Sequence, residues 1–309
     1  MSHIYQLPKR YIMKNKAITI LLTLGLATII NSTNALAESA PTLHSEPQQI
    51  HFQHIRNATS KLTYGDTTFL IDPMLAKKDT YPGFAGTYRS EIRIPMIDLP
   101  MSAKAVIDNV DAVIVTHTHL DHWDDAAQSV IPKTMPLFVQ NEEDANTIRA
   151  QGFKDVRVLG IKTQFNGISL TKTGGQHGTD EMYAIPALAK ALGEAMGVIL
   201  EADNYNTVYF VGDTIWRDEV EDALHKFKPE FVVLNTGDAR MENLKGSIIM
   251  GKEDTVRAIK HAPQANIIAV HMDTVNHAAL TRKELREFVE EKGIEKQVLI
   301  PEDGESLKL

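Results

Sequence analysis

The sequence contains no cysteine. This absence excludes disulfide bonds, thiolate metal ligands, cysteine nucleophiles and a lipid-modified cysteine behind a leader segment. Basic residues are also scarce, since 32 Lys and Arg stand against 40 Asp and Glu. An acidic surface without a basic stripe has little affinity for phosphate backbones, so we expect no nucleic-acid partner.

The first 37 residues have a different composition from the rest of the chain. Their basic side chains precede an uncharged run over residues 17–30, and Ala35-Leu36-Ala37 closes the segment just before Glu38. This order predicts a secretory signal peptide over residues 1–37. The apolar run is short for a bilayer-spanning helix, so an uncleaved anchor is the less favoured alternative. We therefore expect a periplasmic or secreted protein without a membrane span after cleavage.

The remaining chain divides into a short polar segment and one long structured region. Residues 38–49 are predicted to be a flexible lead-in, and residues 50–309 to form one α/β domain in which helices cover sheets. The clearest expected strands are short apolar runs: Thr67–Asp72, Asp111–Thr116, Val156–Leu159, Ile168–Lys172, Thr207–Val211, Phe231–Leu234 and Asn266–Val270. Helices are expected over Asp254–His261 and from Thr281, which opens a capping box, to near Gly293.

The densest group of polar side chains follows the expected strand Asp111–Thr116. His117-Thr118-His119-Leu120-Asp121-His122 places four side chains that can bind metal within six residues. Histidine and carboxylate without sulfur suit zinc, and also manganese or iron. Four such groups on a short loop do not easily face a single ion. The motif therefore predicts two adjacent divalent ions.

This HxHxDH motif after an apolar strand resembles the signature of the metallo-β-lactamase superfamily. Further segments resemble the superfamily's other conserved turns: Phe69–Pro73, Gly175–Gly178, Phe210–Thr214 and Ile268–His271. The resemblance covers most of residues 50–309 and implies a four-layer αββα sandwich with the metal site at one edge of the β-sandwich. The nearest branch holds ascorbate-6-phosphate lactonase-like proteins and the phospholipase D that cleaves N-acyl phosphatidylethanolamines; Gly251 and Pro301–Gly304 support it.

The resemblance also implies the metal ligands. His117, His119 and His177 would hold one ion. Asp121, His122 and His271 would hold the second, with Asp213 between the two. His277, six residues after His271, is an alternative to it, and Asp72 is expected to brace the metal loop rather than to bind metal.

The implied activity is that of a metal-dependent hydrolase. A hydroxide bridging the two ions is expected to attack an ester, lactone or phosphodiester in a small-molecule or lipid-like substrate, with Asp121 accepting the proton. A non-catalytic metal-binding protein, a β-lactam-cleaving enzyme and an iron redox enzyme are the alternatives. The lack of cysteine argues against the best-known β-lactam-cleaving subclass. Residues Thr179–Met196 are expected to form either a lid or apolar wall over the site, or an ordinary surface helix. The sequence gives no indication of oligomeric state.

Overall fold

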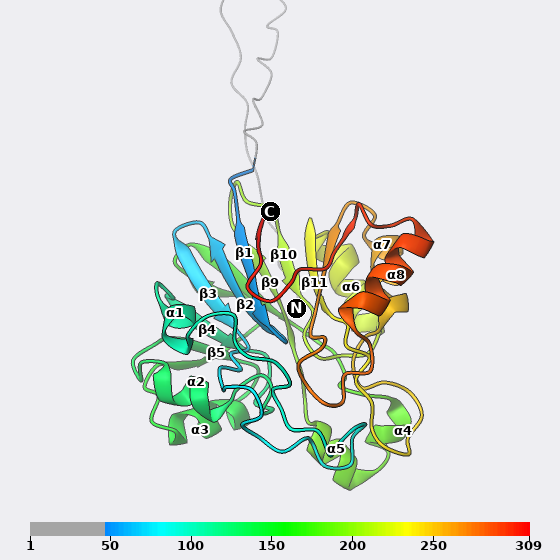
Figure 1. The fold of residues 1–309 in the computed structure, drawn as a ribbon. Helices are drawn as coiled ribbons and strands as arrows, with labels where there is room; N and C mark the ends of the chain where they lie inside the picture. Colours follow the sequence, from blue (N-terminus) through cyan, green and yellow to red (C-terminus); the bar gives the residue numbers. More distant parts are fainter. Residues whose placement is uncertain (1–46) are drawn as a thin grey trace, which may run out of the picture. The chain divides into compact units, whose positions relative to one another are not determined.

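The computed structural model describes residues 47–309, which build two sheets packed face to face (Figure 1). Within these residues the first sheet has the spatial order β14 (Ser306–Lys308), β1 (His51–Arg56), β2 (Thr59–Tyr64), β3 (Thr67–Ile71), β4 (Ala112–Val115), β5 (Leu137–Val139) and β6 (Val156–Val158). The second has the order β13 (Val298–Leu299), β12 (Asn266–Val270), β11 (Phe231–Asn235), β10 (Val208–Phe210), β9 (Gly197–Glu201), β8 (Ile168–Thr173) and β7 (Thr163–Phe165).

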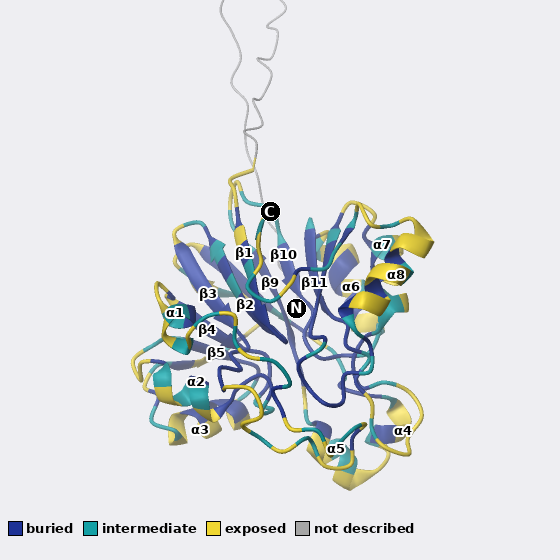
Figure 2. Ribbon diagram, in the orientation of Figure 1, coloured by how far each residue is buried: buried dark blue, intermediate teal, exposed yellow. Residues whose placement is uncertain are grey.

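Three hydrophobic layers hold the sheets and helices together. The inner faces of the two sheets meet in a core that includes Phe52, Phe69 and Phe210. The outer face of the first sheet is covered by α1 (Ala103–Ile107), α2 (Asp125–Val130) and α3 (Glu142–Ala150). The outer face of the second is covered by α6 (Asp218–Phe227), α7 (Lys252–His261) and α8 (Arg282–Lys292). The central strands are buried while these helices keep exposed outer faces (Figure 2), which confirms the predicted αββα sandwich.

Strand direction brings several chain segments to one edge of the sandwich. In the first sheet β3 and β4 are parallel. In the second, β10, β11 and β12 are parallel, and β8 runs the same way because β9 is antiparallel to both β8 and β10. The carboxyl ends of parallel strands are where α/β sheets place their ligand sites. Two short helices, α4 (Asp180–Tyr183) and α5 (Pro186–Leu192), follow β8.

The elements expected from the sequence are present with small shifts at their ends. All seven predicted strands correspond to strands of the two sheets, and α7 and α8 occupy the predicted helical segments. Thr281 and Glu284 form the expected capping box, in which the Thr281 backbone N–H donates to the Glu284 carboxylate over 2.9 Å. Gly293 ends α8 with a left-handed backbone at φ 66°.

The prediction of a signal peptide is corrected here. Residues 1–37 lie outside the described part of the chain, and residues 47–309 show no feature of a signal peptide or a membrane segment. No helix within residues 47–309 is long and apolar enough to cross a bilayer. The structure therefore gives the export signal no support, and we do not carry it further. The periplasmic or secreted destination inferred from it stays a prediction.

Candidate metal centre

Strand ends from both sheets bring all seven predicted ligands together. The loop after β4 supplies four of them, and His177, Asp213 and His271 follow β8, β10 and β12. The seven form two groups in which the possible ligand atoms lie within 4.8 Å of one another: His117, His119 and His177 in one, and Asp121, His122, Asp213 and His271 in the other. All are buried except His119, which is partly exposed. His277 belongs to neither group.

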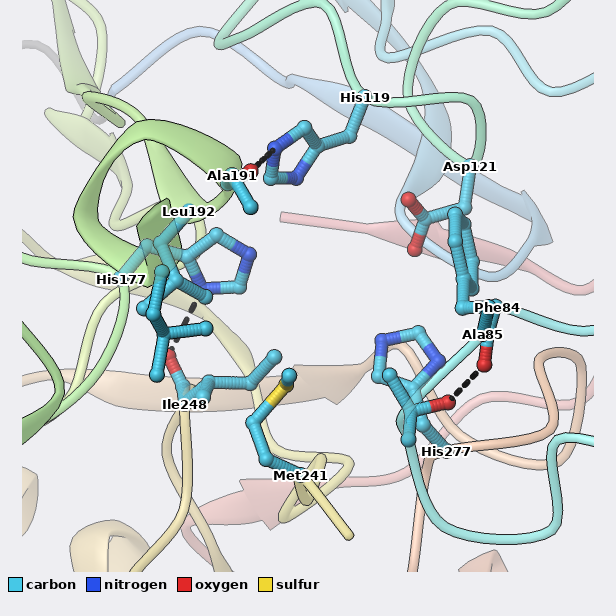
Figure 3. Close-up of a pocket in the computed structure, with 12 residues that line it drawn as sticks. Phe84, Ala85, His119, Asp121, His177, Ala191, Leu192, Met241, Ile248 and His277 are labelled. Atoms are coloured by element: carbon cyan, nitrogen blue, oxygen red, sulfur yellow. Dashed lines mark hydrogen bonds between the residues drawn. The ribbon is translucent and has the colours of Figure 1, made fainter. Parts of the chain in front are cut away.

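Hydrogen bonds turn the free ring nitrogens of the first group inward. His119 donates from Nε2 to the Ala191 carbonyl over 3.0 Å, and His177 donates from Nδ1 to the Ile248 carbonyl over 2.8 Å (Figure 3). The His117 Nδ1 atom lies 3.2 Å from the Thr116 hydroxyl, which itself donates to Asp72. These partners place the ring protons on the outer nitrogens. Burial lowers the pKa of His117 well below its usual value and that of His177 to about 4, so both rings are neutral.

The arrangement of the inward lone pairs indicates whether a cation fits this group. The Nε2 atom of His117 lies 3.0 Å from Nδ1 of His119, and the outer nitrogen of each ring is already engaged. Two imidazole lone pairs that face each other at this distance repel, whereas a divalent cation between them is a Lewis acid that both nitrogens can bind. The donor set therefore fits a metal ion.

The second group combines two carboxylates with two imidazoles. Asp213 Oδ2 lies 3.1 Å from His122 Nε2, 3.5 Å from His271 Nε2 and 3.7 Å from His177 Nε2 of the first group. Burial raises the pKa of Asp213, but the charges of His122 and His271 outweigh it and hold that pKa well below its usual value. Asp213 is thus an anion in contact with residues of both groups, the position in which one carboxylate can bridge two ions.

The carboxylates of this group raise the pKa values of its two imidazoles. Burial lowers the pKa of His271, but Asp213 and Asp121 together raise it to about 9. The same carboxylates raise the pKa of His122 well above its usual value. Two buried carboxylates require positive charge nearby. Protons on these rings supply it, and a divalent cation can supply it in their place.

Side chains around the ligands fix their orientation. Asp72 ends β3 and accepts from His122 Nδ1 over 2.9 Å and from the Thr116 backbone N–H over 2.7 Å, which matches the bracing role expected for it. Sequence reasoning missed two further residues. Asn235 at the end of β11 donates to Asp213 Oδ1 over 2.6 Å, and Asn57 donates from its side chain to the Asp121 carbonyl over 3.1 Å.

Asn57 lies between β1 and β2 with a left-handed backbone at φ 57°. Its carbonyl also accepts from the His271 backbone N–H over 2.9 Å, so one buried residue ties the His271 strand end to the metal loop. Its only sequence signal is that asparagine tolerates a positive φ in a tight turn, which indicates a turn and not a metal centre.

A cavity of about 180 Å³ opens onto the two groups. His119, Asp121 and His177 form one part of its wall, and the Asp121 carboxylate points into it (Figure 3). The other lining residues are mostly apolar: Phe84, Ala85, Leu188, Ala191, Leu192, Met241 and Ile248, with Thr87 and His277. Leu188, Ala191 and Leu192 come from α5, so the Thr179–Met196 segment provides an apolar wall of the site. Whether this segment moves as a lid stays a prediction.

Replacing Asp72 with asparagine is expected to weaken metal binding by roughly 10- to 100-fold, the usual cost of losing a carboxylate behind a histidine ligand. The amide would place an N–H₂ group against donors that now converge on Asp72. Competition with a chromogenic chelator measures the affinity. Asp111→Asn is the matched control, because Asp111 is exposed at the opposite end of β4 and, within residues 47–309, its side chain accepts only from the Thr68 backbone N–H. Equal affinities in the Asp72 variant and the unaltered protein would contradict the bracing role.

The family of this chain follows from the fold, the site and a direct comparison. Residues 67–272 match the family model described as a beta-lactamase superfamily domain, so the chain belongs to the metallo-β-lactamase superfamily. This confirms the superfamily predicted from the HxHxDH motif. The narrower resemblance to the ascorbate-6-phosphate lactonase and N-acyl phosphatidylethanolamine phospholipase D branch stays a prediction.

Relatives and solved structures agree with this assignment. The chain is 48% identical to the UPF0173 protein YddR of Bacillus subtilis, over 83% of this chain and 99% of that protein. A crystal structure described as a possible metal-dependent hydrolase from Veillonella parvula has 56% identity and a TM-score of 0.83, covering 84% of this chain and 99% of that one. The isothiocyanate hydrolase from Delia radicum gut bacteria has 50% identity and a TM-score of 0.81, covering 83% and 98%.

Proposed function

We propose that this metal-dependent hydrolase of the metallo-β-lactamase superfamily cleaves a small, uncharged electrophile that carries an apolar substituent. The observation that carries the proposal is the cavity in which an apolar wall meets the His/Asp groups. Isothiocyanates are the first substrate class to test. Esters and lactones remain within the proposal, since they are also uncharged.

The seven His and Asp side chains suit two divalent ions, with zinc the first choice for such ligands and manganese or iron as alternatives. When bound, such ions lower the pKa of a water molecule and polarise the bond that it attacks. Asp213 would hold both ions, because its Oδ2 atom faces both groups. Asp121, whose carboxylate points into the cavity, would accept the proton that the attacking water loses (Figure 3).

The size and charge of the cavity favour a neutral substrate of modest size. Among the described residues, neither Lys nor Arg lines it. Lys190 lines a neighbouring cavity that also reaches His117 and His119. A phosphodiester would find no cationic side chain in the apolar cavity itself, which makes it the least favoured of the substrates expected from the sequence. A cavity of about 180 Å³ compares with the 150 Å³ engineered cavity that takes up benzene, so it suits a substituent about the size of an aromatic ring.

The isothiocyanate class is suggested by the 50%-identical isothiocyanate hydrolase, whose structure the present fold matches. Hydrolysis of R–N=C=S consumes one water and gives the amine R–NH₂ and carbonyl sulfide. The water oxygen bonds to the central carbon, the carbon–nitrogen bond breaks, and both water protons end on nitrogen. The group is uncharged and its substituent is free to be apolar, as the cavity requires.

Metal analysis combined with a substrate panel tests the proposal. We expect two metal ions per chain and a kcat/KM for benzyl isothiocyanate at least ~100-fold above that for bis-p-nitrophenyl phosphate, a ratio within the range that binding pockets achieve. p-Nitrophenyl acetate is the matched comparison, because it releases the same chromophore from an uncharged ester. Two metals with no turnover would favour a metal-binding protein, and turnover of nitrocefin alone would favour β-lactam cleavage. Either result would overturn the proposal.

A further inference from the structure

One polar side chain in the cavity wall has no role in the two metal-binding groups. Apart from His119, Asp121 and His177, the polar side chains that line the cavity are Thr87 and His277. The Thr87 hydroxyl is fully engaged, since it donates to the Phe84 carbonyl over 2.7 Å and accepts from Asn276 over 2.8 Å. Within residues 47–309, neither ring nitrogen of His277 has a hydrogen-bond partner.

Several contacts hold the His277 ring in place. Phe84 packs against it edge-on, with ring centroids 4.9 Å apart and planes at 80°. The His277 carbonyl accepts from the Arg240 backbone N–H over 3.0 Å. The preceding residue, Asn276, is anchored to Phe84, Thr87 and Tyr88 through its side-chain amide. The ring is only 6% exposed and points into the cavity from the side opposite His119 (Figure 3).

The two ring nitrogens of His277 have different surroundings. A buried N–H group without an acceptor costs more than a buried lone pair without a donor, so the ring proton is favoured on the nitrogen that a ligand can reach. Nδ1 is buried without a partner, whereas Nε2 is the ring nitrogen left open toward the cavity. Burial lowers the pKa of His277 to about 4, so the ring is neutral and presents one N–H and one lone pair. A fixed, neutral donor in a mostly apolar cavity is suited to recognise one polar atom of a bound molecule.

We propose that His277 contacts the substrate directly and donates a hydrogen bond to the atom that gains negative charge when water adds to the electrophile. This inference rests on the proposed function. In an isothiocyanate the atom is sulfur or nitrogen, and in an ester or lactone it is the carbonyl oxygen. The donor stands across the cavity from His119, so the reacting carbon would lie between the metal-binding groups and the imidazole.

Two substitutions at His277 separate hydrogen bonding from packing. In the metal-loaded full chain, His277→Leu is expected to lower kcat for benzyl isothiocyanate by about 100-fold, the usual effect of losing one such donor. The metal content should change little. His277→Gln retains a donor, and its kcat should stay within about 10-fold of the unaltered protein. His51→Leu is the matched control, because His51 is exposed at the start of β1, at the opposite edge of the sandwich.

Two kinetic results would overturn the inference. The first is a His277→Leu protein that keeps two metals and a kcat within about 3-fold of the unaltered protein. The second is loss of metal in both the Leu and the Gln variants, which would place His277 in the metal centre. Thermal unfolding of each variant shows whether the Leu protein is folded. If it is not folded, kcat of His277→Gln is compared with kcat of His277→Asn, whose amide donor reaches less far into the cavity. Equal kcat values in these two variants would then overturn the inference.

A binding measurement separates this inference from the proposed substrate class. 2-Phenylacetamide offers an aromatic ring and a neutral carbonyl but resists hydrolysis. We expect calorimetry to show about 10-fold weaker binding to His277→Leu than to the unaltered protein, the loss of one hydrogen bond of 1.4 kcal/mol. If isothiocyanates are not hydrolysed and this difference remains, only the substrate class fails. Equal binding, or no binding to the unaltered protein, would overturn the role of His277.

Discussion

Asp213→Asn is expected to lower kcat/KM by on the order of 10³-fold and to release metal from both groups, because a single carboxylate oxygen faces both. Asn235 donates to Asp213 Oδ1 over 2.6 Å, so the amide oxygen of the variant would turn toward Asn235. The N–H₂ group would then take the place of Oδ2, which lies 3.1 Å from His122 Nε2. A donor in that position cannot bind a cation. Elemental analysis and steady-state kinetics on the same preparation measure both effects.

The control for this variant is an equally conservative change away from the site. Asp222→Asn replaces an exposed aspartate of α6 and should leave activity and metal content unchanged. An Asp213→Asn protein that keeps two metals and full activity would contradict the bridging position. Retention of one metal would mean that one group holds its ion without Asp213. This result would also contradict the bridging position of Asp213.

Removal of metal is expected to lower the melting temperature by roughly 8–16 °C for each ion lost. A ligand present at 1,000 times its Kd stabilises the folded state by about 4.1 kcal/mol, and each kcal/mol shifts the melting temperature of a domain this size by about 2–4 °C. The ions would bind groups that are buried and fully formed only in the folded chain. Calorimetric scans of the protein dialysed against chelator, with and without added zinc, give the shift.

The apo protein should still fold cooperatively. The positive charges that Asp121 and Asp213 require are then supplied by His122 and His271, whose pKa values these carboxylates raise. In the Asp213→Asn protein, added zinc should move the melting temperature much less. Identical melting temperatures for the chelated and the zinc-loaded protein would refute a metal centre in the folded chain.

The sequence was most informative where neighbouring residues carry the signal. Buried strands such as Asn266–Val270 are runs of apolar residues, and the four ligands from His117 to His122 are adjacent in the chain. His177, Asp213 and His271 have weak local signals, and the resemblance to a family is what identifies them as ligands.

Residues that act through distant contacts could not be predicted in the same way. Asn57 and Asp121 are 64 residues apart, and their contact depends on the packing of β1 and β2 beside the metal loop. His119 contacts the backbone carbonyl of Ala191. Every residue has such a carbonyl, so no residue type in the sequence indicates this contact. From the sequence, His277 is only an alternative to His271 as a metal ligand. Its place in the cavity depends on Phe84 and Asn276, which no spacing rule connects to it.

The division of the metal-binding residues between two sheets has a mechanical consequence. The His117–His122 loop belongs to the first sheet, and His177, Asp213 and His271 belong to the second. Bound ions would therefore link the two sheets and resist sliding of one sheet over the other. A pulling force applied through the two sheets would have to break the metal–ligand bonds before it exposed the apolar core. Metal occupancy would then set the rupture force of the molecule.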